Sequence, residues 1–261
     1  MTMISIAERR KHILEGIRNN GFVKVAELAE ELNVTQATIR KDLRFLEEKN
    51  LLYRAHGSAM PTMAPAAPTP VKEVSFETKK AAHTDLKQRI AARAIQFVEE
   101  NDTIIIGPGS TMTIFAERIQ PKGHLNVVTP SVTISSTLGA NPEITIRQLG
   151  GVLHGSSLSV HGKTAIRALN NILCSKLFFG VDGFDLEYGL TCSTVQEAEL
   201  LHHMIQSASQ AIVLADSSKA GQRGFGRICA IKDVDILITD AGLPEKIRRN
   251  IEAQGVNVIL V

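Results

Sequence analysis

A loop of glycine and hydroxyl residues, Gly107-Pro108-Gly109-Ser110-Thr111, directly follows an apolar run at residues 103–106. If the run is a strand and the loop opens a helix, backbone N–H groups and hydroxyls at the helix N-terminus would face an anion such as phosphate. The loop lacks the Gly-Lys-Ser/Thr ending of a nucleotide-binding P-loop, so it does not indicate ATP. An ordinary strand-to-helix turn is the competing interpretation.

Three further segments place polar residues or paired glycines after apolar runs. They are Leu149-Gly150-Gly151, residues 180–185 with Glu197 shortly after them, and Asp216-Ser217-Ser218-Lys219. Open α/β sheets bind ligands at the carboxyl ends of their strands, which is where these segments would lie. Asp182, Glu197 and Lys219 are therefore candidate ligand contacts. For each of them taken singly, a surface salt bridge is the competing interpretation.

A second candidate site lies near the N-terminus, on a segment with helical periodicity that runs to about residue 49. At about 100° per residue, Ile39, Leu43 and Leu46 share one face of this helix. The opposite face carries Ala37, Arg40, Lys41 and Arg44. Arginine suits guanine edges and phosphates, lysine suits phosphate, and a small residue permits close approach to a groove. A solvated basic face on a small helical subdomain is the competing interpretation.

The neighbouring residues predict the elements that would hold this basic face. Apolar residues recur with helical spacing in a helix ending near residues 19–21 and in a second helix at residues 25–32, and Thr35 is a candidate N-cap of the third. Two short helices, a tight turn and a third helix within about 30 residues fit a helix-turn-helix. Residues 51–58 read as a strand and a turn, a wing on which Arg54 and His56 could touch DNA.

A proline-rich stretch divides the chain, because four of the nine prolines fall within residues 61–70. Proline fixes φ and removes an N–H donor, so neither a helix nor a sheet continues through it. We expect a DNA-binding domain at residues 1–60, a linker at 61–75 and a larger domain at 76–261.

The larger domain is expected to be α/β. Residues 76–100 have the pattern of one long amphipathic helix. Short buried strands are expected at residues 103–106, 126–128, 144–146, 177–179, 211–214, 236–238 and 256–259. Helical stretches separate most of these strands, which predicts a mainly parallel sheet covered by helices.

The composition excludes several other classes of protein. The 261 residues are 44% hydrophobic and 21% charged, which is typical of a globular protein. The net charge of +2 does not by itself indicate a nucleic-acid-binding protein. No apolar run approaches the 18 residues of a membrane span, and we expect no membrane partner. The three cysteines and His154, His161, His202 and His203 lack metal-ligand spacing, so we expect reduced thiols, no metal and no cofactor.

Residues 8–59 closely resemble the N-terminal domain of the DeoR family of bacterial transcription regulators. The resemblance rests on Arg9, Ile13, Glu27-Leu28-Ala29, Asn33-Val34-Thr35, the run Thr38-Ile39-Arg40-Lys41-Asp42-Leu43, Leu46, His56 and Gly57. Lys41 stands where the family usually has a second arginine, and Ser58 where a second glycine is usual. We expect the DNA contacts to come from Thr35, Gln36, Ala37, Thr38, Arg40, Lys41, Arg44, Arg54 and His56.

Residues 76–261 resemble the sensor region of the same family, which is similar to the ribose-5-phosphate isomerase fold. The matching runs begin at Gly107, Leu149, Lys176, Gly189, Leu214 and Asp233. The resemblance implies that Gly109, Ser110 and Thr111 hold a phosphate, and that Asp182, Glu197 and Lys219 hold the sugar. Ser131, Gly151 and Gly183 are expected to contribute beside them. Gly107 and Pro130 depart from residues common in the family, Asp and Asn, and leave the ligand's identity open.

We therefore expect a DNA-binding transcription regulator and not an enzyme. The expected partners are double-stranded operator DNA of a sugar-catabolism operon, a phosphorylated sugar that controls repression, and further copies of the chain in a dimer or tetramer. The expected location is the bacterial cytoplasm, on the nucleoid when bound to DNA. An isomerase-type enzyme with a DNA anchor is the alternative, weakened because residues 192–196 replace the Lys-Gly-rich run of the isomerase. A protein-interaction module with a purely structural anion loop is a third possibility.

Overall fold

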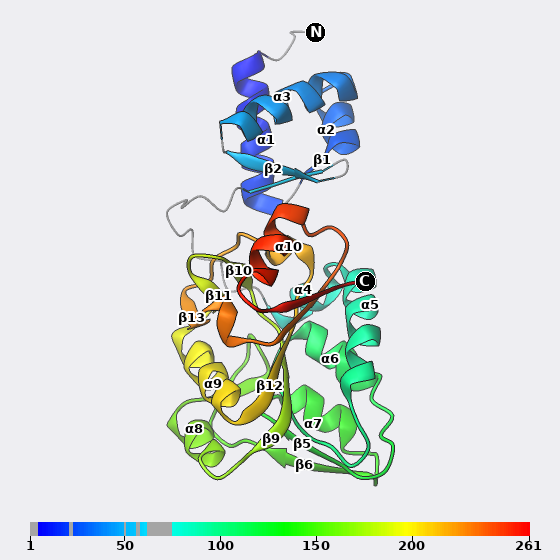
Figure 1. The fold of residues 1–261 in the computed structure, drawn as a ribbon, viewed down its shortest axis with the longest axis vertical. Coiled ribbons are helices and arrows are strands. Elements are labelled where there is room, and N and C mark those ends of the chain that lie inside the picture. The colour runs from blue at the N-terminus through cyan, green and yellow to red at the C-terminus, as the bar shows by residue number, and fades with distance from the viewer. Residues whose placement is uncertain (1–4, 21–22, 50, 56–57, 62–74) are drawn as a thin grey trace.

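The computed structural model describes residues 5–20, 23–49, 51–55, 58–61 and 75–261. Figure 1 shows that these residues form a smaller N-terminal body and a larger body that contains a long twisted sheet. His56 and residues 62–74 of the expected linker lie outside the described residues. No helix within the described ranges is long and apolar enough to cross a membrane.

The smaller body is a winged helix-turn-helix, as predicted. Its elements are α1 (Ile6–Asn20), β1 (Val23–Lys24), α2 (Val25–Glu31), α3 (Gln36–Glu48), β2 (Leu52–Ala55) and β3 (Ser58–Pro61). The three strands form an antiparallel sheet in the order β1-β3-β2. Aliphatic side chains of α1, α2 and α3, including Ile13, Leu28, Ile39 and Leu43, bury one another in a common core. The apolar periodicity of the sequence therefore faces this core, and the polar face of α3 is left outside.

A seven-stranded parallel sheet forms the centre of the larger body, in the order β15-β14-β12-β9-β4-β5-β6. The strands are β4 (Thr103–Ile106), β5 (Leu125–Thr129), β6 (Ile144–Gln148), β9 (Cys174–Phe179), β12 (Ala208–Leu214), β14 (Ile236–Thr239) and β15 (Asn257–Leu260). Each coincides with or overlaps a strand expected from an apolar run. The central strands are apolar on both faces because helices cover both faces of the sheet.

Alternate residues of the strands enter two separate cores. Ile104, Ile106 and Phe178 pack with α5 (Thr84–Ala94), α6 (Ser110–Glu117) and α7 (Val132–Leu138). Ile105 and Phe179 pack on the other face with α8 (Lys163–Leu169), α9 (Val195–Gln206) and α10 (Glu245–Glu252). The two layers of helices hold the loops at the carboxyl ends of the strands in fixed positions.

The prediction of a single long helix at residues 76–100 is wrong. The segment forms α4 (Phe76–Ala81), α5 and a short 3-10 turn (Ile95–Phe97). The break falls at His83, whose φ of 53° is left-handed and cannot continue a right-handed helix. The break exposes the last carbonyl groups of α4, and the Lys79 carbonyl oxygen accepts hydrogen bonds from the side chains of Lys87 and Ser110.

Two small antiparallel sheets were not expected from the sequence. One is the hairpin β7 (Val152–His154) and β8 (Ser159–His161). The other contains β10 (Gly183–Asp185), β11 (Gly189–Cys192) and β13 (Gly226–Cys229). The segment at residues 180–185, expected at the carboxyl end of a strand, therefore ends as a strand of this second sheet.

Candidate functional sites

The basic face of α3 is positioned by a cap and a turn. Asn33 has a left-handed φ of 49°, which tightens the turn between α2 and α3. The Thr35 hydroxyl then accepts the Thr38 N–H at 3.2 Å and begins α3. Both residues belong to the turn that the sequence predicted.

The predicted DNA-contacting residues of this helix lie together on one surface. Thr35, Gln36, Ala37, Arg40, Lys41 and Arg44 are exposed, and Thr38 is half-buried. Gln36 accepts a hydrogen bond from Arg40 Nη2 at 3.2 Å, which holds the arginine along the helix. A helix-turn-helix presents such a surface to the major groove. Arg54 lies in β2, and its side chain, like all of His56, lies outside what the structure describes.

Asp42 does not belong to this exposed surface. It is 2% exposed and pairs with Arg9 and with Arg10, whose Nε is 2.9 Å from Asp42 Oδ1. The Arg10 guanidinium also stacks 3.6 Å from the centre of the Phe45 ring. Asp42 therefore holds α1 against α3 and fixes the angle at which the basic face is presented.

The second candidate site is a cavity of about 290 Å³ at the carboxyl ends of β4, β9 and β12. Six residues predicted from the sequence line it together, namely Gly109, Ser110, Thr111, Asp182, Glu197 and Lys219. They come from three loops and from α9, elements far apart in the chain. The switch in strand order between β4 and β9 places these loops side by side, which is where open α/β sheets bind ligands.

One wall of the cavity is the start of α6. Gly109 precedes this helix with a φ of 122°, a conformation that favours glycine. The first N–H groups of a helix have no acceptor within it, so the first turn of α6 directs donors at the cavity. This geometry agrees with the anion-binding loop expected from the sequence.

Three lysines line the cavity, and two of them, Lys79 and Lys87, were not predicted. Lys87 is 4% exposed, and its Nζ donates to the Lys79 carbonyl oxygen. Burial lowers the pKa of Lys87 to about 8; the charge of Asp216 opposes this shift, and those of Lys219 and Lys79 add to it. Both lysines face the cavity because the chain breaks between α4 and α5. The sequence does not show this break, so it does not distinguish these lysines from solvated ones.

Carboxylates face the lysines across the cavity. Lys79 Nζ lies 2.6 Å from Asp182 Oδ1, and the Ser193 hydroxyl donates to Asp182 Oδ2. Burial alone would raise the pKa of Asp182, but the charge and hydrogen bond of Lys79 and the Ser193 hydroxyl hold that pKa below its usual value. Ionised carboxylates accept hydrogen bonds from hydroxyl groups. The cavity thus combines donors for an anion with acceptors for hydroxyls.

Three of the predicted residues lie outside the cavity lining. Ser131 is buried and caps α7 by accepting the Ile134 N–H at 3.3 Å. A Cβ at Gly151 would stand 2.6 Å from the His161 carbonyl oxygen. A Cβ at Gly183 would stand 2.2 Å from the Gln222 carbonyl oxygen. Ser131 therefore begins a helix, and Gly151 and Gly183 permit close backbone packing.

Nucleophilic chemistry has little support among the cavity residues. Cys192 lines the cavity, but burial raises the pKa of its thiol far above neutrality, with the charges of Glu197 and Asp182 adding to the shift. A thiol that stays protonated is a poor nucleophile. Within the described ranges, no group of three or more His, Cys, Asp or Glu side chains is placed to hold a metal ion.

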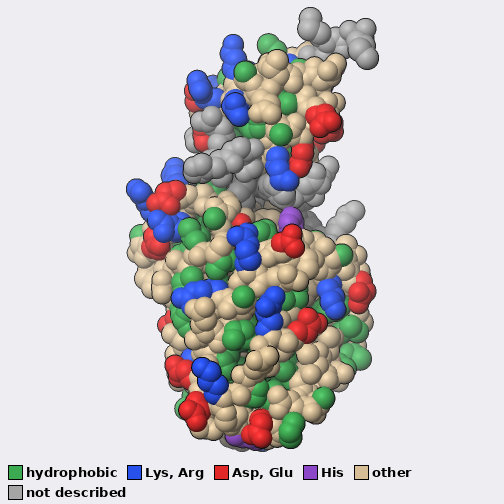
Figure 2. Space-filling view, turned by 90° about the vertical axis from the view of Figure 1, so that its right-hand side faces the viewer, with side chains coloured by type: hydrophobic (Ala, Val, Ile, Leu, Met, Phe, Trp, Pro, Cys, Tyr) green, Lys and Arg blue, Asp and Glu red, His purple; other side chains and the backbone are tan. Residues whose placement is uncertain are grey.

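Charge on one face of the larger body is mixed. Figure 2 shows basic and acidic side chains interspersed over the visible face of the larger body, with no block of one sign. A surface of this kind does not attract a polyanion over a wide area. This face of the larger body therefore offers DNA no basic patch that compares with the face of α3.

Comparison with known proteins covers both bodies. A profile of the DeoR-like helix-turn-helix domain matches residues 9–61, and one of the DeoR C terminal sensor domain matches residues 82–241. The HTH-type transcriptional regulator YulB of Bacillus subtilis is 34% identical over 98% of this chain and 97% of its own.

Two further relatives are named for the genes they control. The lactose phosphotransferase system repressor of Streptococcus mutans is 32% identical over 93% of this chain and 95% of its own. The glycerol-3-phosphate regulon repressor of Escherichia coli is 27% identical over 91% of this chain and 92% of its own. Among solved structures, ribose 5-phosphate isomerase from Plasmodium falciparum aligns with 52% of each chain at 18% identity and a TM-score of 0.38.

Proposed function

The chain belongs to the DeoR family of transcription regulators, and we propose that it represses a sugar-catabolism operon under the control of a phosphorylated sugar. The relatives named for lactose and for glycerol 3-phosphate support a link to carbohydrate metabolism. We further propose that it acts as a homo-oligomer on operator DNA in the bacterial cytoplasm, on the nucleoid.

The residues that line the cavity support the part of this proposal that concerns the sugar phosphate. The start of α6 and the ammonium groups of Lys79 and Lys87 attract an anion, while Asp182 and Glu197 accept hydrogen bonds from hydroxyls. A sugar phosphate presents both kinds of group in one small molecule. We assign its phosphate to Gly109, Ser110 and Thr111, and its sugar to Asp182, Glu197 and Lys219.

The exposed face of α3 supports the part of the proposal that concerns binding to DNA. We assign base contacts to Arg40 and Arg44, whose guanidinium groups suit guanine, and phosphate contacts to Lys41. Thr35, Gln36, Ala37 and Thr38 border the same surface. Contacts from Arg54 and His56 of the wing remain predictions from the sequence.

An enzymatic role is disfavoured by the family and by the cavity. Family members are named as regulators and repressors. The segment at residues 192–196 supplies a buried thiol and two hydroxyl side chains where the isomerase has its lysine. A coupled assay with pentose and hexose phosphates should detect no turnover, and turnover that Glu197→Gln abolishes would establish the enzyme instead.

Thermal unfolding with a panel of sugar phosphates tests the effector assignment. A ligand at 100 times its Kd adds about 2.7 kcal/mol of stability, so the cognate phosphate should raise the Tm clearly. The unphosphorylated sugar at the same concentration is the matched control and should leave the Tm unchanged. If every phosphate fails to stabilise the full chain, the cavity is structural and a protein-interaction role gains support.

A further inference from the structure

Helix α4 is attached to the larger body by groups that also form the effector cavity. Lys79 Nζ lies 2.6 Å from Asp182 Oδ1. The Lys79 carbonyl oxygen accepts a hydrogen bond from Ser110 Oγ at 3.3 Å and another from Lys87 Nζ. All four residues line the cavity. The polar attachment of α4 and the effector site therefore share the same side chains.

The proposed effector needs each of the three partners that now hold Lys79. A serine hydroxyl has one proton to donate, so Ser110 cannot serve a phosphate and the Lys79 carbonyl oxygen at the same time. A phosphate also draws the Lys87 ammonium group away from that neutral oxygen, because a hydrogen bond between two charged groups is the stronger one. Sugar hydroxyls would take Asp182 from the Lys79 ammonium group. The effector and the docked α4 therefore compete.

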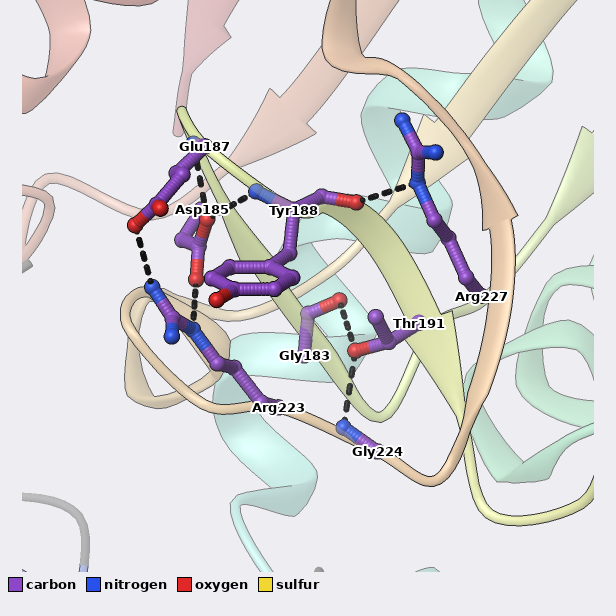
Figure 3. A network of polar contacts seen from close by, with 8 residues as sticks. All are labelled: Gly183, Asp185, Glu187, Tyr188, Thr191, Arg223, Gly224 and Arg227. Carbon is purple, nitrogen blue, oxygen red and sulfur yellow. Dashed lines mark hydrogen bonds and ion pairs between the residues drawn. The ribbon is translucent and has the colours of Figure 1, made fainter. Parts of the chain in front are cut away.

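The wall that carries Asp182 is firmly held, so α4 is the side that gives way. The Asp182 N–H donates to the Thr191 carbonyl oxygen at 2.9 Å. Figure 3 shows the adjoining layer, where the Thr191 hydroxyl donates to the Gly183 carbonyl oxygen at 3.1 Å and accepts the Gly224 N–H at 2.9 Å. Strand β10 begins at Gly183 and pairs with β11, so the backbone directly after Asp182 belongs to a sheet.

Helix α4 is held more weakly than that wall. It has six residues, and so short a helix is not stable by itself. It ends next to His83, whose left-handed φ of 53° is costly for a residue other than glycine. The exposed Lys80 Nζ lies 4.0 Å from Glu117 Oε1, a surface pair that adds little. Without the contacts of Lys79, α4 depends mainly on Phe76, which is 6% exposed.

The place of α4 in the chain connects it to the DNA-binding domain. Residues 62–74 join β3 of that domain to Ser75. The Ser75 hydroxyl accepts the Thr78 N–H at 3.4 Å and so begins α4. The docked position of α4 therefore sets the point on the larger body at which the DNA-binding domain is attached.

We infer that the effector displaces α4 from the cavity, and that this displacement is the step that couples effector binding to the DNA-binding domain. In the free chain Asp182, Ser110 and Lys87 hold α4. In the bound chain the sugar phosphate takes these partners, and the attachment point of the DNA-binding domain moves. Paired DNA-binding domains need a fixed spacing on an operator, so this movement weakens DNA binding. The inference rests on the proposed function, because it requires a phosphate at the start of α6.

Hydrogen exchange in the full wild-type chain tests the displacement, with inorganic phosphate as the probe and chloride at the same ionic strength as the control. Phosphate should slow exchange at the start of α6 and speed exchange in α4, so the two segments should change in opposite directions. Slower exchange at α6 without faster exchange in α4 would overturn the inference and leave the proposed function intact. No slowing at α6 would refute the phosphate site, and the inference with it.

Phe76→Ala tests the competition, because it loosens α4 and lies outside the cavity lining. With its competitor weakened, inorganic phosphate should bind about fivefold more tightly or better, as measured by a phosphorus NMR titration. Operator binding without effector should weaken by about the same factor in fluorescence anisotropy, because coupling between two sites is reciprocal. A residue with a purely structural role would not strengthen phosphate binding when it is truncated.

Phe97→Ala is the matched control, since it truncates another phenylalanine of the same segment. Phe97 is half-buried in the 3-10 turn after α5 and lies outside the cavity lining. This variant should bind phosphate and operator like the wild type, and circular dichroism shows whether both variants fold. A folded Phe76→Ala chain with unchanged or weaker phosphate binding, or with unchanged operator binding, would overturn the inference. If Phe76→Ala does not fold, the exchange experiment on the wild type decides.

Discussion

Lys87 gives the cavity a positive charge that changes with pH. Its ammonium group is buried, and its hydrogen bond goes to the carbonyl oxygen of Lys79. Burial lowers the pKa of Lys87 to about 8, with the charges of Lys219 and Lys79 adding to the shift and that of Asp216 opposing it. A bound phosphate dianion would favour the charged amine and raise this pKa again.

This linkage predicts a pH dependence of effector binding. Below pH 8 most Lys87 side chains already carry the proton, whereas above it binding must take up a proton, so affinity should fall as the pH rises through about 8. Calorimetry between pH 7 and 9.5, where the effector phosphate stays dianionic, measures this slope. Lys87→Arg keeps its charge over the whole range and should flatten the curve, while Lys80→Arg on the surface should not. An equal slope in Lys87→Arg would exclude Lys87 as the group that titrates.

On α3, single arginines are expected to carry operator recognition. Arg40→Ala or Arg44→Ala should weaken operator binding by about 1–3 kcal/mol if a bidentate base contact is lost. Lys41→Ala should weaken binding to all sequences evenly and reduce the salt slope by about 1. Fluorescence anisotropy with operator and scrambled DNA measures both effects, and Arg249→Ala on the exposed side of α10 is the control. Unchanged operator affinity in both arginine variants would remove the basic face of α3 from the site.

Among the secondary-structure elements, the loop that begins α6 forms the part of the cavity that the sequence predicted best. Its glycines and hydroxyls were recognisable because an anion-binding helix start needs particular residue types. The parallel strands were equally predictable, since buried strands such as β4 read as continuous apolar runs. The strands β10 and β13 were missed because their few residues, among them Gly183 and Gly226, resemble a loop.

Gly109→Ala tests the role of the α6 start as an element. The φ of 122° and ψ of 161° at Gly109 belong to a region that is almost exclusive to glycine, so alanine should cost on the order of 1–3 kcal/mol. The shifted helix start should also weaken effector binding. Chemical denaturation and an effector titration measure the two losses. Gly155→Ala, at a position with open space and no left-handed φ, should change neither. If Gly109→Ala binds the effector like the wild type, the helix start does not hold the phosphate.

The break between α4 and α5 explains why two of the cavity's three lysines escaped prediction. Apolar periodicity continues across residues 76–100, so the sequence pattern cannot show that His83 is left-handed. In the folded chain this break brings Lys79 and Lys87 to the same cavity. Lys79 Nζ then lies 2.6 Å from Asp182 Oδ1. Such a contact joins residues 103 positions apart in the chain and leaves no local signal.

At the level of the whole molecule, effector control requires a link between the cavity and the DNA-binding surfaces. Lys219 and Gln222 of the cavity lie on the segment that leads directly into β13. A ligand shifts an equilibrium only through different affinities for its two states. We expect the sugar phosphate to favour the arrangement of paired sensor domains that sets the DNA-binding domains at a spacing unsuited to the operator.

The central claim is that a sugar phosphate bound at Lys219 releases the operator, and an operator gel-shift titration with the cognate effector tests it. The wild type should release DNA as the effector is added. Lys219→Ala should bind the operator with wild-type affinity and stay bound, because the DNA surface is intact and the sugar contact is lost. Ser110→Ala should respond at a moderately higher concentration, since backbone N–H groups still hold the phosphate. Release of DNA from Lys219→Ala at the wild-type effector concentration would contradict the account.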